Sequence, residues 1–136
     1  MMTSSARHAV VVVVAGVMVC LAAACNRAKP EELAARTAEQ YYTYLLQGNY
    51  DAFVDGCYQK DTIRAAYRKQ LVENAKMIVH RQEKARGGIK SFVVAAVEAD
   101  AGAHTANVFL DLSFGDGTSA QVLLPMVEKD GLWLMR

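Results

Sequence analysis

The fold is decided by the stretch Thr105-Ala-Asn-Val-Phe-Leu-Asp-Leu-Ser-Phe114. From Ala106 to Phe114 every second residue is apolar, and the residues between them are mainly polar. A period of two predicts a β-strand that buries one face and exposes the other. The following residues, Gly115-Asp116-Gly117, predict a hairpin turn, because glycine tolerates positive φ. This strand is therefore expected to pair with the one that follows it.

Three further strands are predicted around this one. Residues 92–99, which are rich in Val and Ala, precede it. Residues 120–127 follow the hairpin turn, and Pro125 among them indicates an edge strand or a bulge, because proline has no N–H to donate. A turn at residues 128–131 then leads to a short last strand, Leu132–Met135. Strands joined by such short turns predict an antiparallel meander.

The chain before the strands has the period of helices. A first helix is predicted to begin near Pro30 and to end before Gly48. Its apolar residues are four, three and four positions apart, which places them on one helix face. These residues are Ala34, Ala38, Tyr41 and Leu45. A short second helix is expected to follow, with its cap within residues 49–51.

A third and longest helix is predicted to start near Asp61, whose carboxylate suits an N-cap, and to end at Gly87-Gly88. The residues expected to form its buried stripe are Ile63, Tyr67, Leu71, Ala75 and Ile78. Helices and strands are thus segregated along the chain. This order predicts an α+β fold, with three N-terminal helices packed on one face of a four-stranded antiparallel meander sheet.

Residues 1–24 have the build of a secretory signal, with a positive charge at Arg7 followed by an uncharged apolar run. Small residues precede Cys25, and the stretch Ala22-Ala23-Ala24-Cys25 resembles the lipobox of bacterial lipoproteins, although Leu21 stands one place earlier than the usual leucine. The resemblance implies removal of residues 1–24, lipid attachment at Cys25, a tether at 25–30 and a folded domain at 31–136. The domain would then be lipid-anchored on the extracytoplasmic side of the cell membrane or the outer membrane.

Two alternatives stay open for this N-terminal segment. A retained membrane-spanning helix needs about 20 apolar residues, and the run here is slightly shorter. Secretion without a lipid is the other alternative. In each case the rest of the chain lies outside the cytoplasm.

The charges are balanced overall but unevenly distributed. The chain has 15 Lys and Arg against 14 Asp and Glu, which does not indicate a nucleic-acid binder. Residues 60–90, however, hold nine basic residues against three acids. Arg64, Arg68 and Lys69 are candidates for contact with anionic lipid or with an acidic partner in the cell envelope, and the alternative is a solvated helix face.

Few residues suggest chemistry. His80 and His104 have no second ligand at metal spacing, so neither a metal site nor a cofactor is expected. If Cys20 leaves with the signal and Cys25 carries the lipid, Cys57 has no cysteine partner, and it is either a buried thiol or a reactive one. Asp111, on the strand face opposite the apolar one, is the best candidate for a catalytic carboxylate.

Several features together suggest a family. They are the apolar face of the first helix, the link at residues 47–52, the long third helix and the ending Gly131-Leu132-Trp133. This arrangement resembles small bacterial lipoproteins of unknown function with a cystatin-like, nuclear transport factor 2-like (NTF2-like) domain. The resemblance implies a curved sheet around the helices, and Tyr41, Tyr44 and Trp133 are candidates for lining a pocket between them.

Two functions remain open. The first is a membrane-anchored, non-catalytic binding or interaction module of the bacterial cell envelope. The second is a small-molecule-pocket protein or an isomerase-like enzyme that uses the interior of the cone, as some relatives in the superfamily do. A filled interior favours the first, and a deep cavity holding an ionisable residue favours the second.

Overall fold

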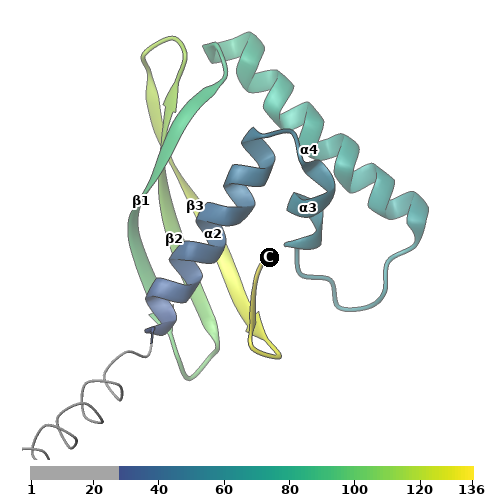
Figure 1. Cartoon of the computed structure of the whole chain (residues 1–136), viewed down its shortest axis with the longest axis vertical. Helices are drawn as coiled ribbons and strands as arrows, with labels where there is room; N and C mark the ends of the chain where they lie inside the picture. Colours follow the sequence, from purple (N-terminus) through teal and green to yellow (C-terminus); the bar gives the residue numbers. More distant parts are fainter. Residues whose placement is uncertain (1–27) are drawn as a thin grey trace, which may run out of the picture.

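The computed structural model describes residues 28–136. Three helices come first and four strands follow: α2 (Pro30–Leu46), α3 (Tyr50–Asp55), α4 (Ala65–Arg86), β1 (Ile89–Asp100), β2 (Thr105–Phe114), β3 (Ser119–Lys129) and β4 (Leu132–Met135). The strands pair antiparallel in the order of the sequence, and the helices lie to one side of the sheet (Figure 1). The predicted α+β meander is therefore confirmed.

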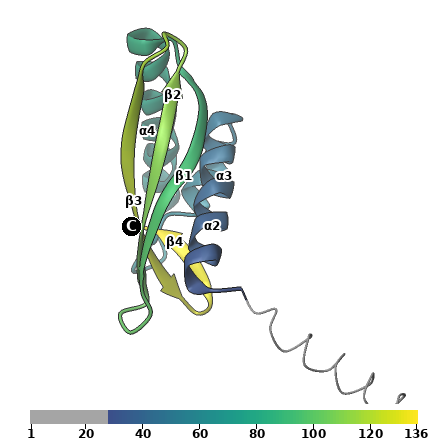
Figure 2. The ribbon, with the colours of Figure 1, turned by 90° about the vertical axis from the view of Figure 1, so that its left-hand side faces the viewer.

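The core lies between α2 and the inner face of β2. The alternating apolar residues of β2 are all buried, with Val108 and Leu110 fully so. Ala34 and Ala38 of α2 are also fully buried, and their small side chains let the helix lie close to the sheet. Figure 2 shows α2 running along one face of the sheet. The predicted faces of the central strand and the first helix are both confirmed.

A short helix and the segment after it protect the edge of the last strand. Asn49 caps α3, because its side-chain oxygen accepts from the N–H of Ala52 at 3.3 Å. The chain then runs beside β4, where the N–H of Tyr58 donates to the carbonyl of Met135 and the N–H of Met135 donates to Gly56. These main-chain hydrogen bonds satisfy backbone groups on the outer edge of β4, a strand of only four residues.

Pro125 lies where pairing on one side of β3 ends. It pairs with Asn107 of β2 without a register shift, whereas β4 pairs only with the last residues of β3, from Met126 onward. β3 is thus an edge strand up to this position. The prediction of an edge position for Pro125 is confirmed, and a missing N–H costs no sheet hydrogen bond there.

The prediction for the third helix is wrong in two respects. The helix begins at Ala65 rather than near Asp61, because the backbone of Arg64 is extended, with φ −69° and ψ 149°. Ala75 is buried as expected, but Tyr67 and Ile78 are 51% and 50% exposed. The reason is that α4 leans on α3 and on the end of β1 instead of lying across the sheet (Figure 1). The face of α4 that makes these contacts therefore carries Arg68 and Ala75.

Candidate functional site

A cavity of about 220 Å³ lies at the end of the sheet where α2 begins. The first residue of α2, the β1–β2 hairpin and the paired ends of β3 and β4 contribute its walls. The lining residues are Pro30, Ala99, Ala101, His104, Glu128 and Trp133. Figures 1 and 2 both place the β1–β2 and β3–β4 hairpins beside the start of α2. We call this space the Trp133 cavity.

A tight turn brings Glu128 and Trp133 together. Asp130 and Gly131 have φ values of 52° and 80°, which is the conformation of a two-residue hairpin loop. The turn pairs Glu128 with Trp133 directly across the two strands, so both side chains lie on the inner face of the sheet. Trp133 is 5% exposed, and its Nε1 is a buried donor with no acceptor among residues 28–136.

His104 completes the polar side of the cavity. It has φ 54°, a left-handed conformation that is uncommon for a residue with a side chain. Its carbonyl accepts from the N–H of Glu128 at 2.8 Å, and its Nδ1 lies 3.4 Å from Oε1 of Glu128. Backbone strain at a cavity wall is a common feature of binding sites. The Glu128 carboxylate, the His104 ring and the Trp133 side chain thus belong to residues that line one small cavity.

Of the three predicted pocket residues, the structure places only Trp133 at this cavity. Tyr41 does not line the cavity, but its hydroxyl donates to the carbonyl of Trp133 at 3.2 Å. Burial raises the pKa of Tyr41 above its ordinary value of 10.0, and the nearby Cys57, Tyr44 and Asp55 raise it further. Tyr44 lies at the surface and accepts from Gln40 at 2.7 Å. Sequence patterns identified the aromatic residues but not which of them share a space.

Asp111 lies on the outer face of the sheet, away from the Trp133 cavity. Its Oδ1 accepts from the side chain of Gln121, its partner on β3, at 2.8 Å. Its partner on β1, Val93, is well exposed, so this face is open to solvent. Asp111 is therefore not brought together with any of the predicted pocket residues.

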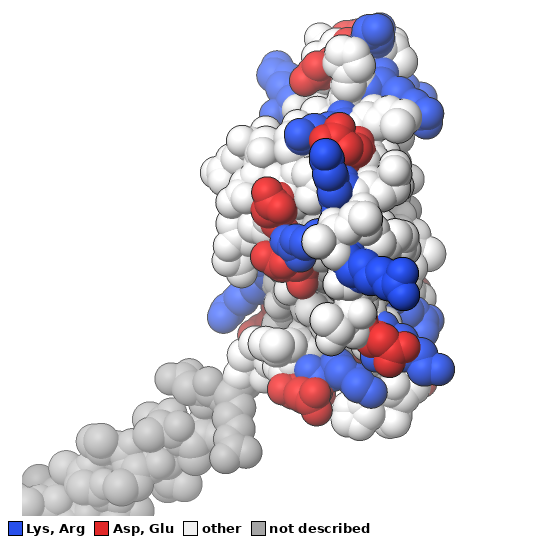
Figure 3. Space-filling view, turned by 90° about the vertical axis from the view of Figure 1, so that its right-hand side faces the viewer, with Lys and Arg blue, Asp and Glu red and all other residues white. Residues whose placement is uncertain are grey.

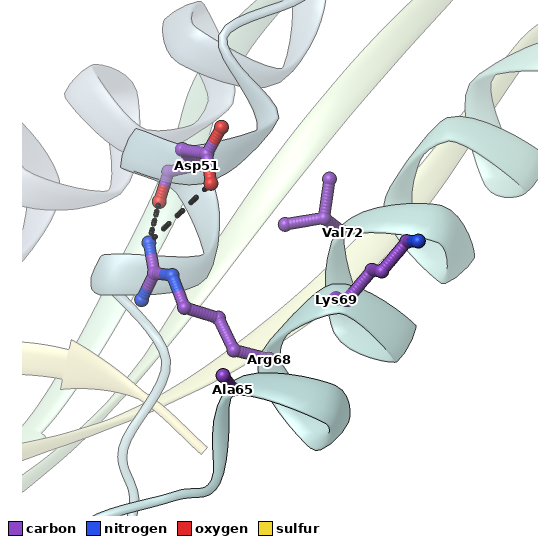
Figure 4. A pocket seen from close by; sticks show the side chains of 5 residues that line it. All are labelled: Asp51, Ala65, Arg68, Lys69 and Val72. Carbon is purple, nitrogen blue, oxygen red and sulfur yellow. Dashed lines mark hydrogen bonds and ion pairs between the residues drawn. The ribbon is translucent and has the colours of Figure 1, made fainter.

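The three basic candidates of α4 have different environments. Arg68 reaches across to α3, where it lies 2.7 Å from Asp55 and 3.7 Å from Asp51 and also donates to the carbonyl of Asp51. Figure 4 shows Arg68 pointing toward Asp51 and Lys69 pointing the other way, beside a second cavity of about 230 Å³. Arg68 therefore fastens α3 to α4, whereas Arg64 and Lys69 are exposed.

Basic side chains are spread over the α4 side of the molecule rather than gathered in one patch. Figure 3 shows Asp and Glu between the Lys and Arg residues on this side. Two further contacts within α4 pair Lys76 with Glu73 and His80 with Glu83. Glu73 and Glu83 are among the three acids of residues 60–90, so the basic excess of this segment is reduced instead by Asp51 and Asp55 of α3, which contact Arg68.

Cys57 is half-buried after α3, and its thiol lies 3.7 Å from the carbonyl of Phe53. Burial raises its pKa above the ordinary value of 9.0. A thiol of this kind is a poor nucleophile at neutral pH. Among residues 28–136, no three His, Cys, Asp or Glu side chains are grouped closely enough to hold a metal ion.

These raised pKa values predict a loss of stability in alkali. Burial also raises the pKa of Tyr42 above 10.0. A group whose pKa is raised by folding favours the native state while it is neutral, and this contribution is lost as pH rises through the raised pKa. The free energy of unfolding, measured by urea denaturation, should therefore fall above about pH 9. Cys57→Ala should delay the onset of that fall, and an onset unchanged by the substitution would contradict the assignment to Cys57.

The fold is that of the NTF2-like proteins. A crystal structure of a Campylobacter jejuni protein, described as an NTF2-like transpeptidase, is similar to this chain with a TM-score of 0.59. The alignment covers 79% of this chain and 97% of that chain, at 12% sequence identity. No protein-family model and no curated protein sequence matches the chain. The resemblance to an NTF2-like domain that the sequence suggested is therefore confirmed at the level of the fold.

The residues that sequence reasoning missed at the Trp133 cavity are Pro30, His104 and Glu128. From the sequence alone, His104 is considered only as a possible metal ligand, and Glu128 is predicted to be part of a turn. One signal was present: a two-residue Asp130-Gly131 loop would have set Glu128 opposite Trp133 by register alone. No sequence pattern indicated that α2 and the β1–β2 hairpin lie beside Glu128 and Trp133.

Proposed function

We propose that this chain is a lipid-anchored, non-catalytic binding module of the bacterial cell envelope, in which Cys25 carries the lipid and the NTF2-like domain does the binding. The signal-like residues 1–24 and the lipobox-like stretch before Cys25 support the anchor. They lie outside the described residues. No helix within residues 28–136 is long and apolar enough to cross a membrane.

The filled interior of the cone is the observation that carries the non-catalytic part of this proposal. Leu110, Met126 and Val108 are the largest fully buried side chains, and they occupy the space between sheet and helices. An isomerase-like site needs a carboxylate held in an apolar cavity at this place. Within residues 28–136 no polar or charged residue is buried, and the side chain of Glu128 is 30% exposed.

The alternative is a small-molecule-pocket protein or an isomerase-like enzyme that uses the interior. The Campylobacter jejuni neighbour is described as a transpeptidase, which keeps an enzymatic role open for the fold. Against it stands the chemistry of the described residues, where the raised pKa of Cys57 disfavours a thiolate and Asp111 lies on an open face. These two observations favour the binding module.

An anchor at Cys25 would also orient the domain. Five residues, 25–29, separate the lipid from the start of α2, and they span at most roughly 17 Å when extended. The end that holds the Trp133 cavity would then lie toward the membrane. The C-terminal end of α4 lies at the opposite end (Figure 1). Arg64, directly before α4, and Lys69, near its start, remain our candidates for contact with anionic lipid or an acidic envelope partner.

The anchor is tested by metabolic labelling with a palmitate analogue in a bacterial host. The wild-type chain is expected to be labelled and to fractionate with membranes, because an acylated Cys25 holds it there. Cys25→Ala should abolish the labelling. The matched control is Cys57→Ala, which removes the other downstream thiol and should leave the labelling unchanged. Labelling of the Cys25→Ala variant would contradict the proposed lipid attachment at Cys25.

A further inference from the structure

The Trp133 cavity has the composition of a site for a small organic cation. Its lining is mostly apolar, with Pro30, Ala99, Ala101 and Trp133 among the lining residues, and Glu128 supplies a carboxylate whose side chain is 30% exposed. Among residues 28–136, only the His104 ring meets this carboxylate, at a long 3.4 Å. An ionised carboxylate has about four acceptor positions, so Glu128 retains capacity to bind a donor.

The charge around this end of the molecule also favours a cation. Acids outnumber bases in the elements that meet here, with two carboxylates in the first turn of α2, one at the end of β1 and two near the β3–β4 turn. The acids are Glu31, Glu32, Asp100, Glu128 and Asp130, and the bases are Lys29 and Lys129. An excess of one sign raises the local concentration of the opposite ion.

We propose that the Trp133 cavity binds the primary ammonium group of a compact, ethanolamine-like molecule, with the Glu128 carboxylate as counter-ion and the Trp133 indole as wall. An ammonium group has three donors and no acceptor, which complements a carboxylate that only accepts. Tryptophan is also the side chain whose ring attracts cations most strongly. The cavity is smaller than the roughly 300–1,000 Å³ of sites for drug-sized ligands, so it suits a compact group.

The Nε1–H of Trp133 is a second, independent feature of this lining residue, because it is buried and has no acceptor among residues 28–136. A buried donor without an acceptor is costly, and such groups in native proteins call for an explanation. An ethanolamine-like molecule carries an oxygen two carbons from its nitrogen. A small adjustment of the wall on binding would let that oxygen accept from the indole while the ammonium stays with Glu128.

This chemistry has two sources, a free amino-alcohol phosphate and the headgroup of phosphatidylethanolamine. The headgroup source rests on the proposed function, because only an anchor at Cys25 would hold this end of the domain against a membrane. Phosphoethanolamine contains the chemistry common to both sources. It is therefore the first probe.

The test uses the full-length chain in detergent micelles and its intrinsic fluorescence, since Trp133 is the only tryptophan. Phosphoethanolamine should change the emission saturably, and phosphocholine, which lacks N–H donors, should not. Glu128→Gln removes the charge and keeps the shape, so binding should weaken at least about ten-fold. The matched control is Glu98→Gln, an exposed glutamate on β1 outside the cavity, and its titration should equal that of the wild type.

A second variant guards against misfolding. Ala101→Leu narrows the cavity and leaves Glu128 in place, and it too should weaken binding. The proposal is overturned if phosphoethanolamine causes no saturable change in the fluorescence of the wild type. It is also overturned if Glu128→Gln folds and binds phosphoethanolamine as the wild type does. If Glu128→Gln does not fold, normal binding by Ala101→Leu overturns the proposal. Vesicles containing phosphatidylethanolamine, compared with phosphatidylcholine alone, then identify the source: a stronger response than to the free compound assigns the lipid, and an equal one the free molecule.

The outcome is separable from that of the proposed function. If the chain is labelled at Cys25 but does not bind phosphoethanolamine, only the proposal for the Trp133 cavity is contradicted. A chain that binds phosphoethanolamine through Glu128 but carries no lipid sinks the anchor alone.

Discussion

Leu110→Ala is expected to lower the free energy of unfolding by about 2–5 kcal/mol, the range for large-to-small substitutions in a core. Leu110 is fully buried in the middle of β2, and it is among the largest side chains in the interior. The substitution removes buried methyl groups and leaves a space that the surrounding sheet and helix fill only in part. Chemical denaturation of the full-length chain, followed by circular dichroism, measures the effect.

The matched control is Leu123→Ala on the neighbouring strand. Leu123 is 51% exposed on the outer face of the sheet, so the same change of side chain should cost less than about 1 kcal/mol. Equal losses for the two variants would contradict the assignment of the inner and outer faces. Because the filled interior carries the non-catalytic proposal, a well-tolerated Leu110→Ala would weaken that proposal as well.

Gly115→Ala is expected to lower the free energy of unfolding by about 1–3 kcal/mol through overpacking. A Cβ at Gly115 would collide with the carbonyl oxygen of Gly87 and lie 2.9 Å from its carbonyl carbon. Both contacts are with backbone, which cannot rotate away. The β2–β3 hairpin docks here on the end of α4, where the N–H of Gly115 donates to Gly88 and that of Asp116 donates to Arg86, both at 2.9 Å.

Gly102→Ala provides the comparison. Gly102 lies in the β1–β2 hairpin, and a Cβ there would meet only the Asp100 carboxylate at an ordinary 3.5 Å. Its cost should be within about 0.5 kcal/mol. The two variants, measured by the same denaturation experiment, separate the close approach at Gly115 from the general effect of alanine in a hairpin. A loss at Gly102 as large as that at Gly115 would contradict the docking of the hairpin on α4.

Elements whose burial is decided by their own period could be predicted from the sequence. The strand around Leu110 and the helix face around Ala38 each bury one side against the sheet core, so their apolar spacing fixed the result. The buried stripe of the third helix could not be predicted, because α4 packs against α3 and the end of β1 rather than across the sheet. Apolar spacing within a helix does not show which neighbouring element it packs against, and the contacts of Arg68 with Asp51 and Asp55 on α3 are contacts of this kind.

The cavity was predictable only in part for a similar reason. Trp133 was named as a pocket candidate from the resemblance to NTF2-like domains, which carry a pocket between sheet and helices. Glu128 and His104 reach it through a cross-strand register and a left-handed backbone conformation, which depend on the two hairpins meeting α2. Those meetings are tertiary contacts between segments about 100 residues apart, such as Pro30 and Trp133.

The most direct test of the central claim is the mass of the N-terminal peptide of the protein isolated from bacterial membranes. We predict that the mature chain begins at Cys25 and that its first peptide carries the added mass of acyl groups. The same preparation of Cys25→Ala should yield no acylated peptide. A mature chain that retains residues before Cys25, or one that begins there without acylation, would contradict a lipid-anchored module.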